Sequence, residues 1–316
     1  MRKPTAATGL ALLALLILCA DARGYPIAEE RKLGERFSIE AAAALPLVRE
    51  PAVVDYVGRI GRRMVARLGA PQPFEYRFSV VRDGQLNAFA VPGGFVYVNS
   101  GLVTRVGNES ELAGVLGHEI GHTHAHHIVR QQEESRLVSY AALAGMLLSV
   151  VQPAIGAAAM GAGMAAQLKY RRQFEQEADY LGIRYMREAG FDPHGMASFM
   201  KRIWNEQRTM PLDQIPPYML SHPLADERIT SLETATKDTR PLPGWERPSA
   251  ELERVQAIVR ALTEDRSSTR ARYQKASATG AAARALYGVV LLYQGDAEAA
   301  LTSLAAAKAE GAAGVD

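Results

Sequence analysis

Two histidines and one glutamate in the run His118-Glu119-Ile120-Gly121-His122 have the residue types and the spacing of a zinc hydrolase site. On a helix, His118 and His122 lie one turn apart on the same face, so both imidazoles can reach one ion. Glu119 is turned to the side of that pair, from which it can reach a water molecule on the ion but cannot readily bind the ion. A glutamate there can take a proton from the water, so that hydroxide attacks a carbonyl polarised by the metal. The run therefore predicts a zinc metallopeptidase centre with Glu119 as its general base.

A third ligand is available about fifty residues downstream, in the acidic run that begins at Glu175. Glu175 and Asp179 are four residues apart and share a helix face, whereas Glu177 is turned well away from it. Ala178 and Gly182 flank that face and are small, which allows a close approach to the histidine helix. We expect Glu175 to complete a site for one zinc ion per chain, and Asp179 to hold a ligand histidine ring. The alternative is that this run is the exposed acidic start of a helix.

Three other histidines are given different interpretations. His127 falls on the apolar face of the motif helix and is predicted to be structural. His126 shares a face with His122, but a pair of these two would lack the intervening glutamate, so an outer or chance role is expected. His222 is followed by Pro223, which restricts its backbone and holds it in place. The residues alone favour a structural role for His222.

Periodicity identifies the elements that must position these side chains. Residues 74–81 alternate like a strand, and residues 88–98 read as a hairpin around Pro92-Gly93-Gly94. Apolar residues recur at helical spacing in several longer segments. We expect these helices at about 28–70, 109–132, 171–190 and 194–209. Small hairpins among long helices predict an α+β catalytic domain.

The segment 137–168, between the two ligand motifs, is nearly uncharged and is interrupted by Pro153 and several glycines. We expect two short helices that form a mobile lid beside the cleft and contact a membrane surface. A buried core hairpin is the alternative.

The N-terminus indicates export from the cytoplasm. Arg2 and Lys3 precede an apolar stretch, and small residues around position 21 form a cleavage site, which predicts a signal peptide over residues 1–22. Cleavage after Ala22 removes the only cysteine, Cys19; lipid anchoring through Cys19 is disfavoured because bulky Leu18 precedes it. The formal net charge of +2 gives no reason to expect a nucleic-acid partner.

The C-terminal part of the chain has a different character. A proline-marked stretch, 241–250, is predicted to be a linker between a metallopeptidase domain over 23–240 and an Ala-rich helical tail over 251–316. Small and apolar residues between Gly288 and Ala307 fit one tetratricopeptide unit, although about three such units are usually needed for stability. Either the tail packs on the catalytic domain or a longer array is lacking, and a generic helical hairpin is the alternative.

Several motifs in a fixed order carry a family resemblance that covers about residues 30–235. They are Asn87-Ala88-Phe89-Ala90-Val91-Pro92-Gly93-Gly94, the His118–His122 run, Glu175-x-x-Ala178-Asp179, Ser221-His222-Pro223 and Arg228. Together they resemble the HtpX-like and CAAX-prenyl-protease-like zinc metallopeptidases, most closely soluble periplasmic, BepA-like members with a tetratricopeptide tail. The resemblance implies a zincin-like, mainly helical domain with a small sheet.

The resemblance also implies a role for each site residue. It assigns zinc to His118, His122 and Glu175, and catalysis to Glu119, with Asp179 outside the ligands as a possible proton donor. His222 would lie close to the zinc and ligate it in a latent state. Two further roles concern the substrate: Arg228 would bind the substrate or its oxyanion, and the strand Asn87, Ala88, Phe89 would pair with a substrate strand.

The function expected is that of a zinc endopeptidase of the bacterial periplasm, acting in quality control or assembly of envelope proteins. Its substrates would be unfolded or stalled envelope polypeptides, and the tail could bind protein partners. The alternative is a chaperone-like assembly factor with a largely latent zinc site. A metal hydrolase with a non-peptide substrate is less favoured, because an edge hairpin suits an extended peptide.

Overall fold

The computed structural model describes residues 27–69, 72–131, 153–208, 210–211, 215–223 and 225–312, with the side chains of helix α7 described from Arg171 onward. The predicted signal peptide with Cys19, and the segment 137–152, lie outside these residues. None of the helices described is both long enough and apolar enough to cross a lipid bilayer.

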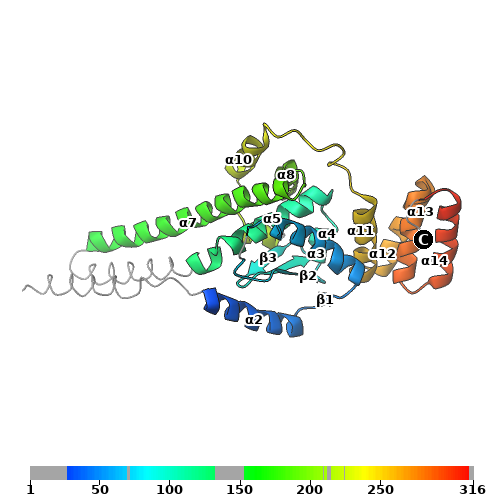
Figure 1. The fold of residues 1–316 in the computed structure, drawn as a ribbon, viewed down its shortest axis with the longest axis horizontal. Coiled ribbons are helices and arrows are strands. Elements are labelled where there is room, and N and C mark those ends of the chain that lie inside the picture. The colour runs from blue at the N-terminus through cyan, green and yellow to red at the C-terminus, as the bar shows by residue number, and fades with distance from the viewer. Residues whose placement is uncertain are drawn as a thin grey trace, which may run out of the picture.

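A small four-stranded sheet lies at the centre of the catalytic part (Figure 1). Its order is β1 (Leu47–Val48), β2 (Arg77–Val81), β4 (Phe95–Asn99) and β3 (Ala88–Val91). The predicted hairpin is confirmed as the antiparallel pair β3–β4. The sequence did not predict that β2 pairs with β4 in parallel, or the short strand β1. This order leaves β3 at an edge of the sheet.

Helices form the rest of this part of the molecule. In chain order they are α2 (Ile27–Ala44), α3 (Pro51–Val65), α4 (Ser100–Val103), α5 (Glu109–His124), α7 (Pro153–Glu188), α8 (His194–Gln207), α9 (Pro217–Ser221) and α10 (Asp226–Thr236). Asn108 caps the start of helix α5, because its side chain accepts from the Glu111 N–H, and α5 is buried along almost its whole length. It is covered by α3, α7 and α8 and by the sheet, so it is the central element.

Small residues let α5 and α7 approach closely, as the sequence predicted for Ala178 and Gly182. A Cβ atom added at Gly121 would lie 2.9 Å from the Ala178 carbonyl oxygen, and one at Gly117 would lie 3.3 Å from the Gly182 Cα. Side chains larger than hydrogen at Gly117 and Gly121 would therefore push the two helices apart.

Two predicted helix boundaries are wrong. The motif helix ends at His124 instead of continuing to 132, because a turn at residues 125–126 places His126 in a left-handed conformation (φ 54°) before helix resumes at His127. Helix α7 is a single helix from Pro153, so Glu175 lies in its middle and is only 8% exposed. The Ala-rich run before Arg171 is a good helix former and its glycines do not interrupt it. Residues 153–168 are thus not a short lid helix, and Glu175 does not belong to an exposed helix start.

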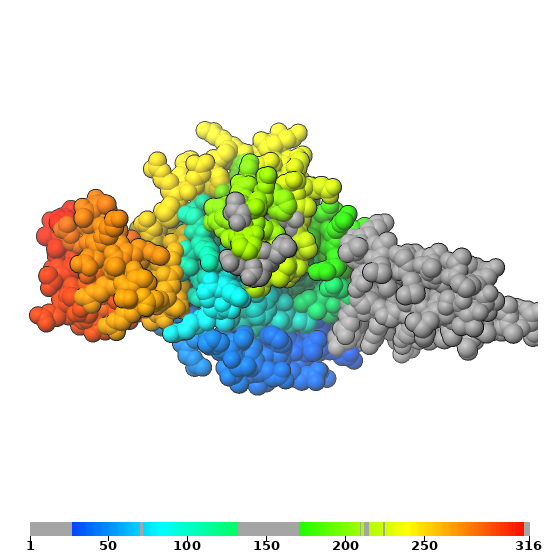
Figure 2. All heavy atoms as spheres, turned by 180° about the vertical axis from the view of Figure 1, so that it is seen from behind, coloured from blue at the N-terminus to red at the C-terminus, as the bar shows by residue number. Residues whose placement is uncertain are grey.

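The tail consists of two helical hairpins that lie at one end of the molecule (Figures 1 and 2). They are formed by α11 (Ala250–Thr263) with α12 (Arg266–Ala276), and by α13 (Ala281–Tyr293) with α14 (Ala297–Ala309). The first helix joins the main core: Leu252, Val255 and Ile258 are buried in the same cluster as the sheet. The Gln256 amide donates to the carbonyls of Val103 and Val106, at 3.0 and 2.8 Å. The tail therefore packs on the catalytic part through α11.

Candidate metal centre

Four side chains from three distant segments converge on one buried point. They are His118 and His122 on α5, Glu175 on α7, and His222 directly after α9, and one donor atom of each lies within 4.8 Å of the others. The Nε2 atom of His118 lies 3.0 Å from Nε2 of His122 and 3.2 Å from Nδ1 of His222. The Glu175 carboxylate lies 3.2 to 3.4 Å from all three rings. The structure thus brings the three ligands expected from the residues together, and adds His222.

The donor chemistry fits zinc, which takes imidazole nitrogens and carboxylate oxygens in tetrahedral sites. Burial, followed by the nearby His118, lowers the pKa of His122 to about 3, so its ring is neutral and can offer a lone pair. Burial alone would raise the pKa of Glu175, but hydrogen bonds from the three histidines outweigh it and hold that pKa well below its usual range. A neutral His122 imidazole beside the anionic Glu175 carboxylate offers two donors of the kind that a divalent cation binds.

Asp179 and Arg228 support the cluster from behind. Asp179 Oδ1 lies 2.9 Å from Nδ1 of His118, the nitrogen that faces away from the other donors. Arg228 donates two parallel bonds to Asp179, at 2.8 and 2.9 Å, and lies 2.8 Å from Glu175. Burial raises the pKa of Asp179, but the Arg228 charge and the His118 contact outweigh it, so the carboxylate stays ionised. These contacts engage the Arg228 guanidinium with protein carboxylates.

Glu119 lies beside the cluster and is 1% exposed. Its Oε2 accepts from the N–H of Ala90, at 3.0 Å, which places the carboxylate against the edge strand β3. Its Oε1 lies 3.4 Å from Nε2 of His222 and has no hydrogen-bond partner among the described residues. Burial raises the pKa of Glu119, which brings the carboxyl nearer to the range where it can both take and return a proton.

The predicted substrate strand lies beside this carboxylate. Ala88 and Phe89 belong to β3, and Asn87 immediately precedes it, bonded through its carbonyl to the Asn99 N–H of β4. One side of β3 pairs with β4, and the Ala90 N–H points from the other side to Glu119. The free side of the edge strand is therefore the side that borders the cluster.

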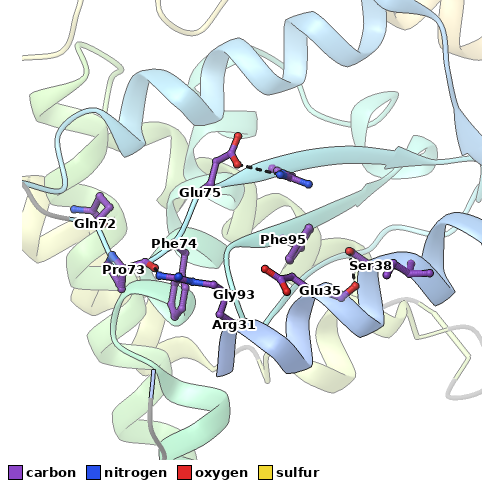
Figure 3. Close-up of a pocket in the computed structure, with 11 residues that line it drawn as sticks. Arg31, Glu35, Ser38, Gln72, Pro73, Phe74, Glu75, Gly93 and Phe95 are labelled. Atoms are coloured by element: carbon purple, nitrogen blue, oxygen red, sulfur yellow. Dashed lines mark hydrogen bonds and ion pairs between the residues drawn. The ribbon is translucent and has the colours of Figure 1, made fainter. Parts of the chain in front are cut away.

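Two cavities differ in their relation to this chemistry. A cavity of about 210 Å³ is lined by Glu119, His122, Glu175 and His222 together with apolar Phe89, Ala90, Ile128 and Phe174. A larger one, of about 720 Å³, lies between α2 and the starts of β2 and β4 (Figure 3). Among its charged side chains, Arg31 donates to the Pro73 carbonyl and Arg77 to Glu75, and none belongs to the cluster. We place the site in the smaller cavity because three of the four clustered donors and Glu119 line it.

Two residues in the site were missed by the sequence analysis. Tyr218 is fully buried, its ring lies 4.9 Å from that of His222, and its hydroxyl has no hydrogen-bond partner in the described part of the chain. In the sequence, its position one helical turn before His222 was the feature that could have indicated a place in the site. His127, expected to be merely structural, has its Nδ1 atom 2.9 Å from Nδ1 of His122. Only the break at residues 125–126 makes this contact possible, and no sequence signal marks that break.

Comparison with known proteins identifies relatives that are named as peptidases. A putative beta-barrel assembly-enhancing protease of Vibrio cholerae is 39% identical over 206 residues, 62% of this chain and 42% of its own length. The beta-barrel assembly-enhancing protease of Escherichia coli (strain K12) is 30% identical over 68% of this chain and 45% of its length. The mitochondrial metalloendopeptidase OMA1 of Schizosaccharomyces pombe is 29% identical over 178 residues, 56% of this chain and 51% of its length. The chain thus spans about half the length of the curated relatives it matches.

The family model for peptidase family M48 matches residues 51–236, which contain strands β2, β3 and β4, the four clustered side chains, Glu119, Asp179 and Arg228. These residues make up more than half of the sequence, and the chain belongs to peptidase family M48.

Proposed function

We propose that the chain is a zinc-dependent endopeptidase that cleaves extended polypeptides bound along β3. One observation carries this proposal. The buried donors His118, His122 and Glu175 lie next to the Glu119 carboxylate, which accepts a hydrogen bond from the edge strand. A peptide strand added to the free side of β3 would run past Glu119, because the Ala90 N–H already reaches that carboxylate.

The residues divide the chemistry between them. Zinc, when bound by His118, His122 and Glu175, would polarise the scissile carbonyl and lower the pKa of a water molecule. Glu119 takes a proton from the attacking water and returns it to the leaving amine. Asp179 and Arg228 act as positioning residues: Asp179 holds the His118 ring, and Arg228 keeps Asp179 ionised and pairs with Glu175.

We further propose that His222 keeps the site latent. Its Nδ1 lies among the ligand atoms, and its Nε2 lies 3.4 Å from Glu119, so its ring fills the space between the donors and the general base. Water and substrate would need this space. The backbone of His222 is anchored to Tyr218 by a 2.8 Å bond from the His222 N–H, so access requires movement of the loop that follows α9.

The relatives named as beta-barrel assembly-enhancing proteases support a role in the bacterial envelope. We propose that substrates are unfolded or stalled envelope polypeptides in the periplasm, that the tail helices α12 to α14 bind protein partners, and that no nucleic acid is involved. The position of His222 also favours a second candidate function, a chaperone-like assembly factor that rarely cleaves.

Export predicts a mature N-terminus at Arg23 without lipid, because the leader ends in small residues. Intact mass spectrometry of the chain recovered from a periplasmic fraction measures this directly. A diacylated Cys19 would mean that the chain is anchored to a membrane instead.

Digestion of casein separates the two candidate functions. Replacing Glu119 by Gln should lower the rate about 100- to 10,000-fold because the general base is lost, while zinc content stays at about one per chain. His222→Ala should cleave at least as fast as the wild type, because the ring no longer covers Glu119. If the wild type and both variants bind zinc but none of them digests casein, the assembly-factor function is favoured.

Zinc analysis of α7 variants tests the ligand assignment. Glu175→Gln should lose most of the metal because a charged ligand is removed, whereas Asp179→Asn should weaken binding by about 10- to 100-fold. Glu188→Gln is the matched control, because this carboxylate lies on the same helix, is about half exposed and pairs only weakly with Arg184. Full zinc content in Glu175→Gln would show that this glutamate is not a ligand.

A further inference from the structure

His122 is supported differently from His118. The outward nitrogen of His118 meets a carboxylate, Asp179, at 2.9 Å. The outward nitrogen of His122, Nδ1, instead meets Nδ1 of His127 at 2.9 Å. On the far side of that ring, Nε2 of His127 lies 3.1 Å from Oε2 of Glu177, and Arg130 donates to the same oxygen at 3.0 Å. A line of contacts therefore runs from the cluster through His127 to Glu177.

The backbone is bent to make this contact. Residues five apart on a continuous helix point about 140° away from each other, so His127 could not face His122 if α5 continued. The turn at Ala125–His126 redirects it, and His126 is the one non-glycine with positive φ among the described residues. That conformation costs on the order of 1 kcal/mol or more. It is held by Glu30 on α2, whose carboxylate lies 2.7 Å from Nδ1 of His126.

Packing fixes the His127 ring in this orientation. The residue is 2% exposed, and its ring stacks on Phe174 with centroids 4.6 Å apart and planes at 26°. The Arg130 guanidinium lies 4.8 Å from the Phe174 ring, so the aromatic ring is itself held in place. Glu177, Arg130 and Phe174 thus confine His127 from the side away from the metal ligands.

Only one arrangement of protons satisfies these contacts while His122 binds a metal. A metal on Nε2 requires the His122 proton to be on Nδ1, where it must be donated. Nδ1 of His127 is then the acceptor, so the proton of that ring is on Nε2 and is donated to Glu177. In this arrangement each donor faces one acceptor: Nδ1–H of His122 faces Nδ1 of His127, and Nε2–H of His127 faces the Glu177 carboxylate.

We infer that His127 and Glu177 form a positioning pair that fixes the tautomer and the orientation of the zinc ligand His122. This inference rests on the proposed zinc site. It assigns a role to Glu177, which is not a clustered donor. It also makes the bend at His126 part of the metal centre, because the pair exists only if the helix ends there.

Zinc affinity, measured on the full chain by competition with a chelator, tests the pair. His127→Phe keeps the stacking ring but removes the acceptor, and should weaken zinc binding about 10- to 100-fold. His127→Gln keeps an acceptor and a donor, so it should bind zinc more tightly than His127→Phe. A packing role would reverse this order, because Phe is the better replacement for a ring stacked on Phe174.

Coupling between the two positions gives a second readout. Glu177→Gln should weaken zinc binding in the wild-type background but have no further effect in His127→Phe, because the contacts described between Glu177 and His122 pass through that ring. His124→Phe is the control: this residue lies near the same helix end, contacts Tyr185, and should leave the affinity unchanged. Thermal unfolding of the zinc-free variants shows which of them fold.

Three results would overturn the inference: additive effects of His127→Phe and Glu177→Gln, wild-type affinity in a folded His127→Phe chain, or His127→Phe binding zinc more tightly than His127→Gln. Failure of the wild type itself to bind zinc would instead overturn the proposed function, and this outcome is seen before any variant is made.

Discussion

Side chains on helices α5 and α7 can converge on one metal-binding point only because the two backbones meet without intervening side chains. The contact passes through Gly117 and Gly121 on one helix and Ala178 and Gly182 on the other. His118 and His122 flank this contact on α5, and Glu175 and Asp179 flank it on α7. Because helix geometry fixes the side-chain directions, a shift of α7 by one residue would turn both carboxylates away from the histidines. The other elements described above either pack against these two helices or contribute residues to the site between them.

Because the site is buried, its charged groups need partners within the protein. Two ionised carboxylates are buried in the site, Glu175 among the ligand rings and Asp179 behind that of His118, and an unpaired buried carboxylate would be costly. Arg228 pairs with both carboxylates, and histidine rings lie 3.2 Å from Glu175 and 2.9 Å from Asp179, so neither carboxylate is left without a partner. Among the described residues, no arginine or lysine pairs with Glu119. Burial raises its pKa, which sets it apart from the other two carboxylates and suits the proposed role of a general base.

Much of the site could be predicted from the sequence because helical spacing alone relates the ligands. The i, i+4 pairs of His118 with His122 and of Glu175 with Asp179 require no knowledge of the fold, and the small residues at 178 and 182 indicated the helix contact. Local rules could not predict the end of α5, because His126 is held in its strained conformation by Glu30, about a hundred residues earlier in the chain. For the same reason the role of His127 was missed. The start of α7 was misplaced because glycines in its Ala-rich part suggested interruption, and the parallel pairing of β2 with β4 is a long-range choice that alternation does not encode.

The most direct measurement is diffraction from crystals of the zinc-loaded chain on both sides of the zinc absorption edge. The account predicts one anomalous peak per chain, about 2.0 to 2.2 Å from Nε2 of His118, Nε2 of His122 and a carboxylate oxygen of Glu175. The outward Nδ1 atoms should face Asp179 and His127. A peak at another place, or one coordinated through Glu177 in place of Glu175, would contradict it.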